Sequence, residues 1–229
     1  MRHTRFPLPV KAVMIDLDGT LADTVADLAA AVNLMLGKLE RAPLDEARVR
    51  TFVGKGIPNL VKRALTGALE GEPEPVLFER ALALYYDCYE SVNGRQATLY
   101  PGVREGIAAL ERAGFPLVCV TNKAERFTAP LLKQLRLDDC FEFVVAGDTL
   151  PKRKPDPLPL TYACGRLAIA PREMLMIGDS LNDAQAARAA GCPVFCVPYG
   201  YNEGADVRGL DVDAIVDTLF EATKLITKS

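Results

Sequence analysis

Histidine is nearly absent from this chain of 229 residues, and the single one, His3, lies at the N-terminus. The ends of a chain are commonly frayed, so His3 is a poor candidate for a catalytic position. The shortage excludes Ser-His-Asp triads, zinc sites built on histidine and a histidine general base. Any catalysis must therefore use carboxylates, lysine, hydroxyl groups or thiols.

The chain also lacks the segments that direct a protein to a membrane or to nucleic acid. No apolar run approaches the ~20 residues that cross a bilayer, and residues 1–9 carry basic side chains without the apolar stretch of a secretory signal. The net charge is −3, and no run of Lys or Arg is long enough for a nucleic-acid footprint. We therefore expect no nucleic-acid partner and no membrane partner.

The six cysteines include no C-x-x-C pair, and several of them lie inside apolar runs. This usage is typical of buried thiols in a reducing compartment, so we expect a cytoplasmic protein. Hydrophobic residues make up 49% of the chain and charged residues 25%, which is ordinary for a globular protein with a full core. For the assembly we expect a monomer or a small homo-oligomer.

Strand-like apolar runs alternate with helix-length amphipathic segments along most of the chain. This alternation predicts an α/β fold with a doubly wound parallel sheet, that is, a Rossmann-like core. The expected strands are 10–15, 117–120, 143–146, 174–177 and 194–197, and the expected helices between them are 103–113, 124–135, 157–167 and 182–190.

Residues 22–97 interrupt the alternation. They contain four helical patterns and no convincing strand, so we expect an inserted α-helical domain at 22–97 and a core made of 1–21 and 98–229. The expected helices of the insertion are 24–36, 46–52, 57–69 and 75–91.

The first expected strand ends in Asp16-Leu17-Asp18-Gly19-Thr20. Alternate side chains of a strand share a face, so the two carboxylates point the same way and Leu17 points to the core. Two unit charges about 4 Å apart repel by about 4 kcal/mol at an effective dielectric near 20. The pair therefore predicts a bound cation or proton, although an acidic turn before a helix also fits this segment taken alone.

Polar side chains also follow the other strands, at the edge of a doubly wound sheet where ligands bind. Taken singly, Thr121 and Ser180 fit helix caps and Lys154 fits a surface charge. An acid, a hydroxyl, a base and another acid at successive strand ends favour one site. The set is Thr121-Asn122-Lys123 after the second strand, Gly147-Asp148 after the third, Asp179 after the fourth, and Lys154 in the loop 151–157.

These groups suit phosphoryl transfer through an aspartyl phosphate. One carboxylate attacks phosphorus, while a hard divalent cation, with Mg²⁺ as the expected one, relieves the crowding of the acids and binds phosphate oxygens. A lysine and a hydroxyl orient the transferring group. The second acid of the pair protonates the leaving oxygen and then activates water.

The same residues resemble the four ordered motifs of the haloacid dehalogenase superfamily, over residues 16–183. The motifs are Asp16-Leu17-Asp18-Gly19-Thr20, Val120-Thr121-Asn122, Lys154-Pro155-Asp156-Pro157 and Gly178-Asp179-Ser180 with Asn182-Asp183. The resemblance implies that the inserted helices form a mobile cap. It also implies a role for each site residue: Asp16 as nucleophile, Asp18 as acid and base, Thr121, Asn122 and Lys154 as phosphate ligands, and Asp16, the Asp18 backbone carbonyl, Asp179 and Asp183 around Mg²⁺.

Within the superfamily the chain is most similar to bacterial phosphoglycolate phosphatases, in segments 21–28, 52–56, 100–103 and 189–194. This resemblance implies a Mg²⁺-dependent phosphatase that hydrolyses a small phosphorylated metabolite, 2-phosphoglycolate. The family often has Gly-Asn-Gly where this chain has Gly54-Lys55-Gly56. We expect Lys55 to enter the site on cap closure and to favour a substrate with a carboxylate, unless it is simply a solvated loop residue.

Other functions share parts of this pattern. A phospho-accepting receiver module also gathers acids, a hydroxyl and a lysine, but the inserted helices and Asp18 argue against it. A 2-haloacid dehalogenase needs neither Asp18 nor the metal acids, and a phosphonatase uses a cap lysine, which keeps Lys55 ambiguous. A capped sugar-phosphate phosphatase or a phosphoglucomutase-like enzyme is the main alternative, because the motifs specify only the phosphate half of the substrate.

Overall fold

The computed structural model describes residues 5–229 and has a parallel six-stranded sheet with the strand order β6-β5-β2-β7-β8-β9. All neighbouring strands run parallel, which confirms the predicted doubly wound fold. Every residue of the central strand β2 is buried, as expected for a strand covered on both faces. The strands of this sheet are β2 (Ala12–Ile15), β5 (Leu117–Val120), β6 (Phe143–Val145), β7 (Met174–Gly178), β8 (Val194–Cys196) and β9 (Ala214–Ile215).

The register of the central strands places their carboxyl ends together. Ile15, the last residue of β2, pairs with Cys119 of β5 and with Ile177 of β7. The chain therefore leaves the three strands at nearly the same level. The polar residues that follow them are brought to one edge of the sheet.

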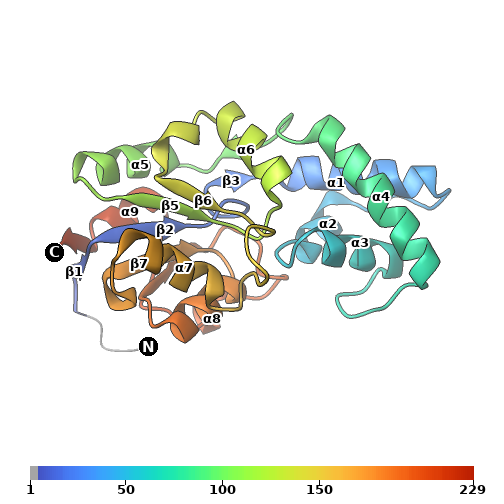
Figure 1. Ribbon diagram of the computed structural model, residues 1–229. Helices are drawn as coiled ribbons and strands as arrows, with labels where there is room; N and C mark the ends of the chain where they lie inside the picture. Colours follow the sequence, from blue (N-terminus) through green and yellow to red (C-terminus); the bar gives the residue numbers. More distant parts are fainter. Residues whose placement is uncertain (1–4) are drawn as a thin grey trace.

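Helices cover both faces of the sheet (Figure 1). The apolar side chains of α5, α6 and α9 pack in one buried cluster with one face of the sheet, and those of α7 and α8 pack with the other. The strands therefore contact a helical layer on both sides of the sheet, which explains why both of their faces are apolar. The helices are α5 (Val103–Arg112), α6 (Glu125–Gln134), α7 (Leu158–Leu167), α8 (Leu181–Ala190) and α9 (Leu219–Thr223), with short 3₁₀ turns at Asp138–Cys140, Pro171–Glu173 and Val207–Gly209.

Apart from shifts of one or two residues at the ends of other elements, two expected elements differ from those in the structure. The expected strand at 10–15 is divided at Lys11, because β1 (Leu8–Val10) leaves the main sheet and pairs with β10 (Ile226–Lys228). The expected helix at 57–69 ends at Thr66. Gly67 follows with φ of +68°, a left-handed conformation that commonly ends a helix.

Four helices lie beyond the carboxyl ends of the strands, on the right of Figure 1. They enclose an apolar cluster of their own, which Phe127 of α6 and Tyr201 of the loop after β8 join from outside the four helices. The chain enters and leaves this region through an antiparallel pair, β3 (Ala22–Asp23) with β4 (Thr98–Leu99). On this basis we propose residues 22–97 as the cap. Its helices are α1 (Val25–Lys38), α2 (Glu46–Phe52), α3 (Ile57–Thr66) and α4 (Pro75–Val92).

The six cysteines are all free, and five of them are buried, while Cys140 is half-buried. This agrees with the buried thiols expected from the sequence. Among the described residues, no helix combines the length and the apolar character needed to cross a membrane.

Candidate active site

Asp16 is held at the end of β2 by the backbone around it. Its N–H donates to the carbonyl oxygen of Ile177 at 3.0 Å, and its Oδ1 accepts from the N–H of Leu17 at 2.7 Å. The turn that follows needs a glycine, because Gly19 has φ of +87° and a Cβ there would lie 2.3 Å from Oδ2 of Asp179. The turn thus brings the backbone of Gly19 directly against Asp179, the acid that follows β7.

Three carboxylates converge at this edge of the sheet. Asp16, Asp179 and Asp183 each offer an oxygen, and these oxygens all lie within 4.8 Å of one another. Asp179 is fixed by donors on both oxygens: the hydroxyl of Thr20 at 3.0 Å and the N–H of Tyr201 at 2.5 Å. The structure thus brings these three predicted site residues together.

Burial strongly disfavours the ionised form of two of these acids. Burial raises the pKa of Asp16 to about 7, with Lys154 opposing the rise and Asp183 adding to it. Burial also raises the pKa of Asp179 well above its usual range, and the charges of Asp183 and Asp16 raise it further. A divalent cation would relieve this repulsion. The donor set consists of carboxylate oxygens, and such hard ligands suit Mg²⁺ rather than zinc or copper.

Asp183 occupies the first turn of α8. One of its oxygens, Oδ2, accepts from the Ser180 hydroxyl at 2.8 Å and from the Ser180 N–H at 3.2 Å. Ser180 is therefore the N-terminal cap residue of α8, which is the role that the sequence suggested for it taken singly. Because Oδ1 of Asp183 pairs with Lys154 at 2.7 Å, both oxygens already have protein donors.

Lys154 lies inside the acid cluster and is almost wholly buried. Its Nζ lies 3.0 Å from Oδ1 of Asp16 and 2.7 Å from Oδ1 of Asp183, and it donates to the carbonyl oxygen of Val120 at 2.7 Å. Burial lowers the pKa of Lys154, but the two carboxylates more than offset this, and the pKa rises above its usual value. Lys154 therefore remains a cation beside Asp16, and the surface-charge alternative is wrong.

Thr121 and Asn122 directly follow β5, at the edge of the sheet where Asp16 lies. Thr121 is buried, and its hydroxyl oxygen accepts from the N–H of Lys123 at 3.2 Å. Asn122 donates from Nδ2 to the carbonyl oxygens of Gly54 at 3.0 Å and Lys154 at 2.8 Å. Its Oδ1 is buried without a hydrogen-bond partner among the described residues.

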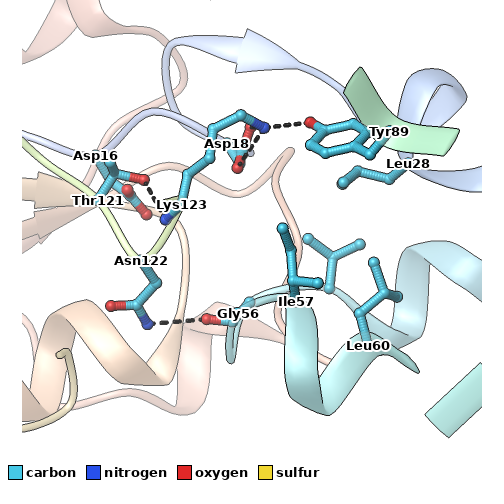
Figure 2. Close-up of a pocket in the computed structure, with 12 residues that line it drawn as sticks. Asp16, Asp18, Leu28, Gly56, Ile57, Leu60, Tyr89, Thr121, Asn122 and Lys123 are labelled. Carbon is cyan, nitrogen blue, oxygen red and sulfur yellow. Dashed lines mark hydrogen bonds and ion pairs between the residues drawn. The ribbon is translucent and has the colours of Figure 1, made fainter. Parts of the chain in front are cut away.

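A cavity of about 50 Å³ lies between this edge of the sheet and the cap (Figure 2). This is far smaller than the ~300–1,000 Å³ typical of pockets for drug-sized ligands, so with the cap in this position the site suits a small molecule. Polar groups line one side and aliphatic cap residues the other. The lining consists of Asp16, Asp18, Thr121, Asn122 and Lys123 from the core, and Leu28, Val53, Gly54, Gly56, Ile57, Leu60 and Tyr89 from the cap.

Comparison with known proteins agrees with this geometry. Residues 10–191 match the model of the haloacid dehalogenase-like hydrolases. The chain belongs to the haloacid dehalogenase-like hydrolase family. It is 62% identical over 224 residues to a phosphoglycolate phosphatase of Nitrosospira multiformis, covering 98% of this chain and 99% of that relative. It is 54% identical to a phosphoglycolate phosphatase of Thiobacillus denitrificans, with the same coverage.

A solved structure has the same fold. The crystal structure of a predicted phosphoglycolate phosphatase from Haemophilus somnus 129PT superposes with a TM-score of 0.87 at 34% identity, covering 92% of this chain and 95% of that one. Together with the relatives, it identifies this hydrolase as a phosphoric monoester hydrolase acting on a small phosphorylated substrate.

Lys55 is the predicted site residue that the structure does not bring to the others. The glycines on either side of it do line the cavity, and Gly54 accepts hydrogen bonds from Asn122 and Asn182. The side chain of Lys55 is turned to Glu203, with Nζ 3.0 Å from its carboxylate. The predicted loop is therefore at the site, but its cation is paired outside the cavity.

The carboxylate of Asp18 also lies outside the metal cluster. It accepts from the hydroxyl of Thr24 at 2.8 Å and pairs with Nζ of Lys123 at 3.3 Å. The metal role predicted for Asp18 concerns its backbone carbonyl and stays a prediction. Its side chain faces the cavity, where an acid and base must lie.

Sequence reasoning assigned no role to three residues of this site. Lys123 and Tyr89 line the cavity, and the backbone of Tyr201 holds Asp179. The position of Lys123, directly after Thr121-Asn122 at a strand end, was a usable signal. Tyr89 and Tyr201 carried none, because each reaches the site from a segment distant in sequence.

Proposed function

We propose that the chain is a Mg²⁺-dependent phosphoglycolate phosphatase that converts 2-phosphoglycolate to glycolate and inorganic phosphate. The observation that carries this proposal is the 62% identity, over nearly the whole of both chains, to a relative named for that activity. The geometry of the site supports the same reaction, since Asp16, Asp18 and Thr121 line one small cavity and the acid cluster with Lys154 adjoins it at Asp16.

In the first step, an oxygen of Asp16 attacks phosphorus and the bond from phosphorus to the glycolate oxygen breaks. Asp18 gives its proton to that oxygen, and glycolate leaves. In the second step, Asp18 takes a proton from water, and the water oxygen attacks the phosphorus of the aspartyl phosphate. Inorganic phosphate leaves, and Asp16 and protonated Asp18 are restored.

The remaining polar residues hold the transferring group. Thr121 presents a hydroxyl to phosphate oxygens, and Lys154 supplies a fixed positive charge beside Asp16. Asp16, Asp179 and Asp183 would hold Mg²⁺, which when bound neutralises part of the charge of the phosphoryl group. Through its contacts with the Ser180 hydroxyl and with Lys154, Asp183 would also orient these two neighbours.

The cavity favours this substrate over a sugar phosphate, the main alternative. Apart from Tyr89, the side chains on its cap side are aliphatic: Leu28, Val53, Ile57 and Leu60. A sugar would leave several hydroxyl groups against this wall without partners, which costs about 1–3 kcal/mol for each unpaired buried group. Phosphoglycolate has one carbon between its two charged groups and has no such hydroxyls.

The test is phosphate release by the wild-type protein with Mg²⁺, comparing 2-phosphoglycolate with glucose 1-phosphate and glucose 6-phosphate. We expect the highest kcat/KM for 2-phosphoglycolate and no release by Asp16→Asn, which controls for a contaminating phosphatase. Faster hydrolysis of either glucose phosphate would contradict the proposed substrate and support the alternative.

We further propose that the enzyme works in the cytoplasm. All six thiols are free, which suits a reducing compartment.

A further inference from the structure

Lys123 contributes the cationic side chain among the residues that line the cavity. It is buried, with 2% of its side chain exposed. A buried ammonium group is costly unless it is paired, so its partners indicate what it does at this position.

Two partners hold the ammonium of Lys123, namely Asp18 of the core and Tyr89 of the cap (Figure 2). Its Nζ lies 3.3 and 3.4 Å from the oxygens of Asp18, and it donates to the hydroxyl oxygen of Tyr89. It also lies over the ring of Tyr89, 4.7 Å from the centroid. An ammonium group has three N–H donors. Among the described residues, the two contacts to Asp18 are long and go to the two oxygens of one carboxylate, so a single N–H can serve both. With a second N–H directed to Tyr89, one donor is left for a ligand in the cavity.

Lys154 differs in this respect. Its three N–H donors match three protein acceptors: Asp16, Asp183 and the carbonyl oxygen of Val120. It lies in the acid cluster and does not line the cavity. The two buried lysines are therefore suited to different parts of a substrate.

We propose that Lys123, together with the hydroxyl of Tyr89, binds the carboxylate of the substrate and makes the enzyme selective for small phosphate esters that carry one. This inference rests on the proposed function. It assigns to Lys123, which lines the cavity, the carboxylate-binding role that the sequence suggested for Lys55.

The chemistry of the cavity supports this assignment. A carboxylate placed against the aliphatic wall needs a charged partner within the cavity, and a lysine is the direct one. Burial raises the pKa of Tyr89 well above its usual value, so its phenol keeps its proton and can donate. Two donors thus meet at one place, on the opposite side of the cavity from Thr121 and Asn122 (Figure 2).

The subsite is shared between the two parts of the chain. Lys123 follows β5 of the core, whereas Tyr89 lies on α4 of the cap. The pair of donors therefore exists only when cap and core are in contact. A carboxylate that binds both donors would favour the contact between cap and core. Binding of the substrate would therefore also close the site and exclude water from it.

The test compares two esters of similar size, 2-phosphoglycolate and 2-hydroxyethyl phosphate, which has an alcohol in place of the carboxylate. The readout is the ratio of their kcat/KM values, because damage to Asp18 chemistry lowers both and cancels in the ratio. We expect Lys123→Met to lower this ratio about 10- to 100-fold, the range for a hydrogen bond to a charged group. Tyr89→Phe removes one donor and should lower it less, by about 3- to 10-fold.

Lys55→Met is the matched variant, because it removes a cation at the same boundary but outside the cavity. We expect it to leave the ratio unchanged. A second readout is the Kd of 2-phosphoglycolate in the Asp16→Asn background, which should rise when Lys123→Met is added. If Lys123→Met folds poorly by circular dichroism, Tyr89→Phe carries the test.

The outcomes separate this inference from the proposed function. A wild-type enzyme that hydrolyses 2-phosphoglycolate, with a ratio unchanged in both Lys123→Met and Tyr89→Phe, overturns the subsite and leaves the function standing. A lowered ratio in Lys55→Met alone also overturns it, in favour of Lys55. A wild type that does not hydrolyse 2-phosphoglycolate contradicts the proposed function itself.

Discussion

Arg63 of the cap donates from Nη2 to the carboxylate of Glu203 in the core at 2.6 Å. Arg63 is buried, and its other donors are used by the carbonyl oxygens of Phe52 and Leu69. Lys55 pairs with the same oxygen of Glu203 at 3.0 Å. One carboxylate of the core thus holds two cations of the cap, and the neighbouring loop is kept over the active site.

Glu203→Gln should weaken this contact, because the neutral amide cannot balance the positive charge of the buried Arg63 guanidinium. We expect the free energy of unfolding to fall by about 1–3 kcal/mol. We also expect the KM for 2-phosphoglycolate to rise several-fold, with a smaller change in kcat. Urea unfolding and steady-state kinetics measure the two effects.

The matched control is Glu72→Gln. Its carboxylate pairs with Lys62 at 2.6 Å within the cap, and the side chain of Glu72 is 78% exposed. An exposed ion pair contributes about 0–1 kcal/mol, so this variant should differ little from wild type. Equal losses in both variants would show that the contact between Arg63 and Glu203 does not hold the cap.

Asp16→Asn and Asp18→Asn should fail at different steps. Asp16→Asn loses the nucleophile, so neither phosphoenzyme nor turnover should be detectable although the fold is retained. Asp18→Asn loses the proton donor and acceptor, which should lower kcat about 10²- to 10⁴-fold. Rapid-quench measurement of phosphoenzyme separates the two. Multiple turnover by a folded Asp16→Asn protein would exclude the covalent mechanism.

The parts of the fold and site that the sequence predicted well depend on local patterns. Asp16 directly follows β2 and Asp179 directly follows β7, and the parallel pairing of these two strands brings both acids to the same edge. The boundaries of α2 also agree with expectation, because Asp45 caps it by accepting from the N–H of Arg48 at 2.6 Å. These features follow from a few neighbouring residues.

What the sequence did not predict depends on partners far along the chain. Lys55 is turned away from the cavity by Glu203, which is 148 positions later in the sequence. The division of the first strand at Lys11 likewise depends on β10 at the other end of the chain. No local pattern around Lys55 or Lys11 records these pairings, so they become visible only when the chain is folded.

Lys154→Met should destabilise the protein as well as lower its activity. The change leaves the buried carboxylates of Asp16 and Asp183 without their shared cation, and breaking a buried ion pair costs about 3–5 kcal/mol. We expect a lower midpoint of urea unfolding and a fall of more than about 10²-fold in kcat/KM. Lys152→Met, at an exposed position two residues away, is the control. A wild-type midpoint for Lys154→Met would mean that Lys154 does not balance these charges.

The stability of the metal-free protein should decrease as the pH rises from about 5 to 7. The pKa of Asp16 is raised from 3.8 to about 7 in the folded protein, chiefly by burial. The folded state therefore binds more protons than the unfolded state between these two values. The stability contributed by the protonated acid is fully present below the unfolded pKa and is lost as the pH rises through the folded pKa.

Each extra proton bound by the folded state lowers the free energy of unfolding by at most about 1.4 kcal/mol for each unit that the pH rises. Asp179, whose pKa is also raised by burial, adds to this decrease. Asp23 and Glu203 have lowered pKa values, so their contributions are already complete by about pH 5. Urea unfolding in excess chelator at several pH values measures the slope, and Asp16→Asn should reduce it.

Added Mg²⁺ should reverse this trend, because the cation binds the ionised acids and competes with protons for them. Its stabilisation, RT ln(1 + [Mg²⁺]/Kd), should therefore grow as the pH rises from 5 to 7. In Asp16→Asn the Mg²⁺ effect should be much smaller, since one of the three carboxylates is lost. A Mg²⁺ effect that is independent of pH, and the same in wild type and Asp16→Asn, would place the cation away from these acids.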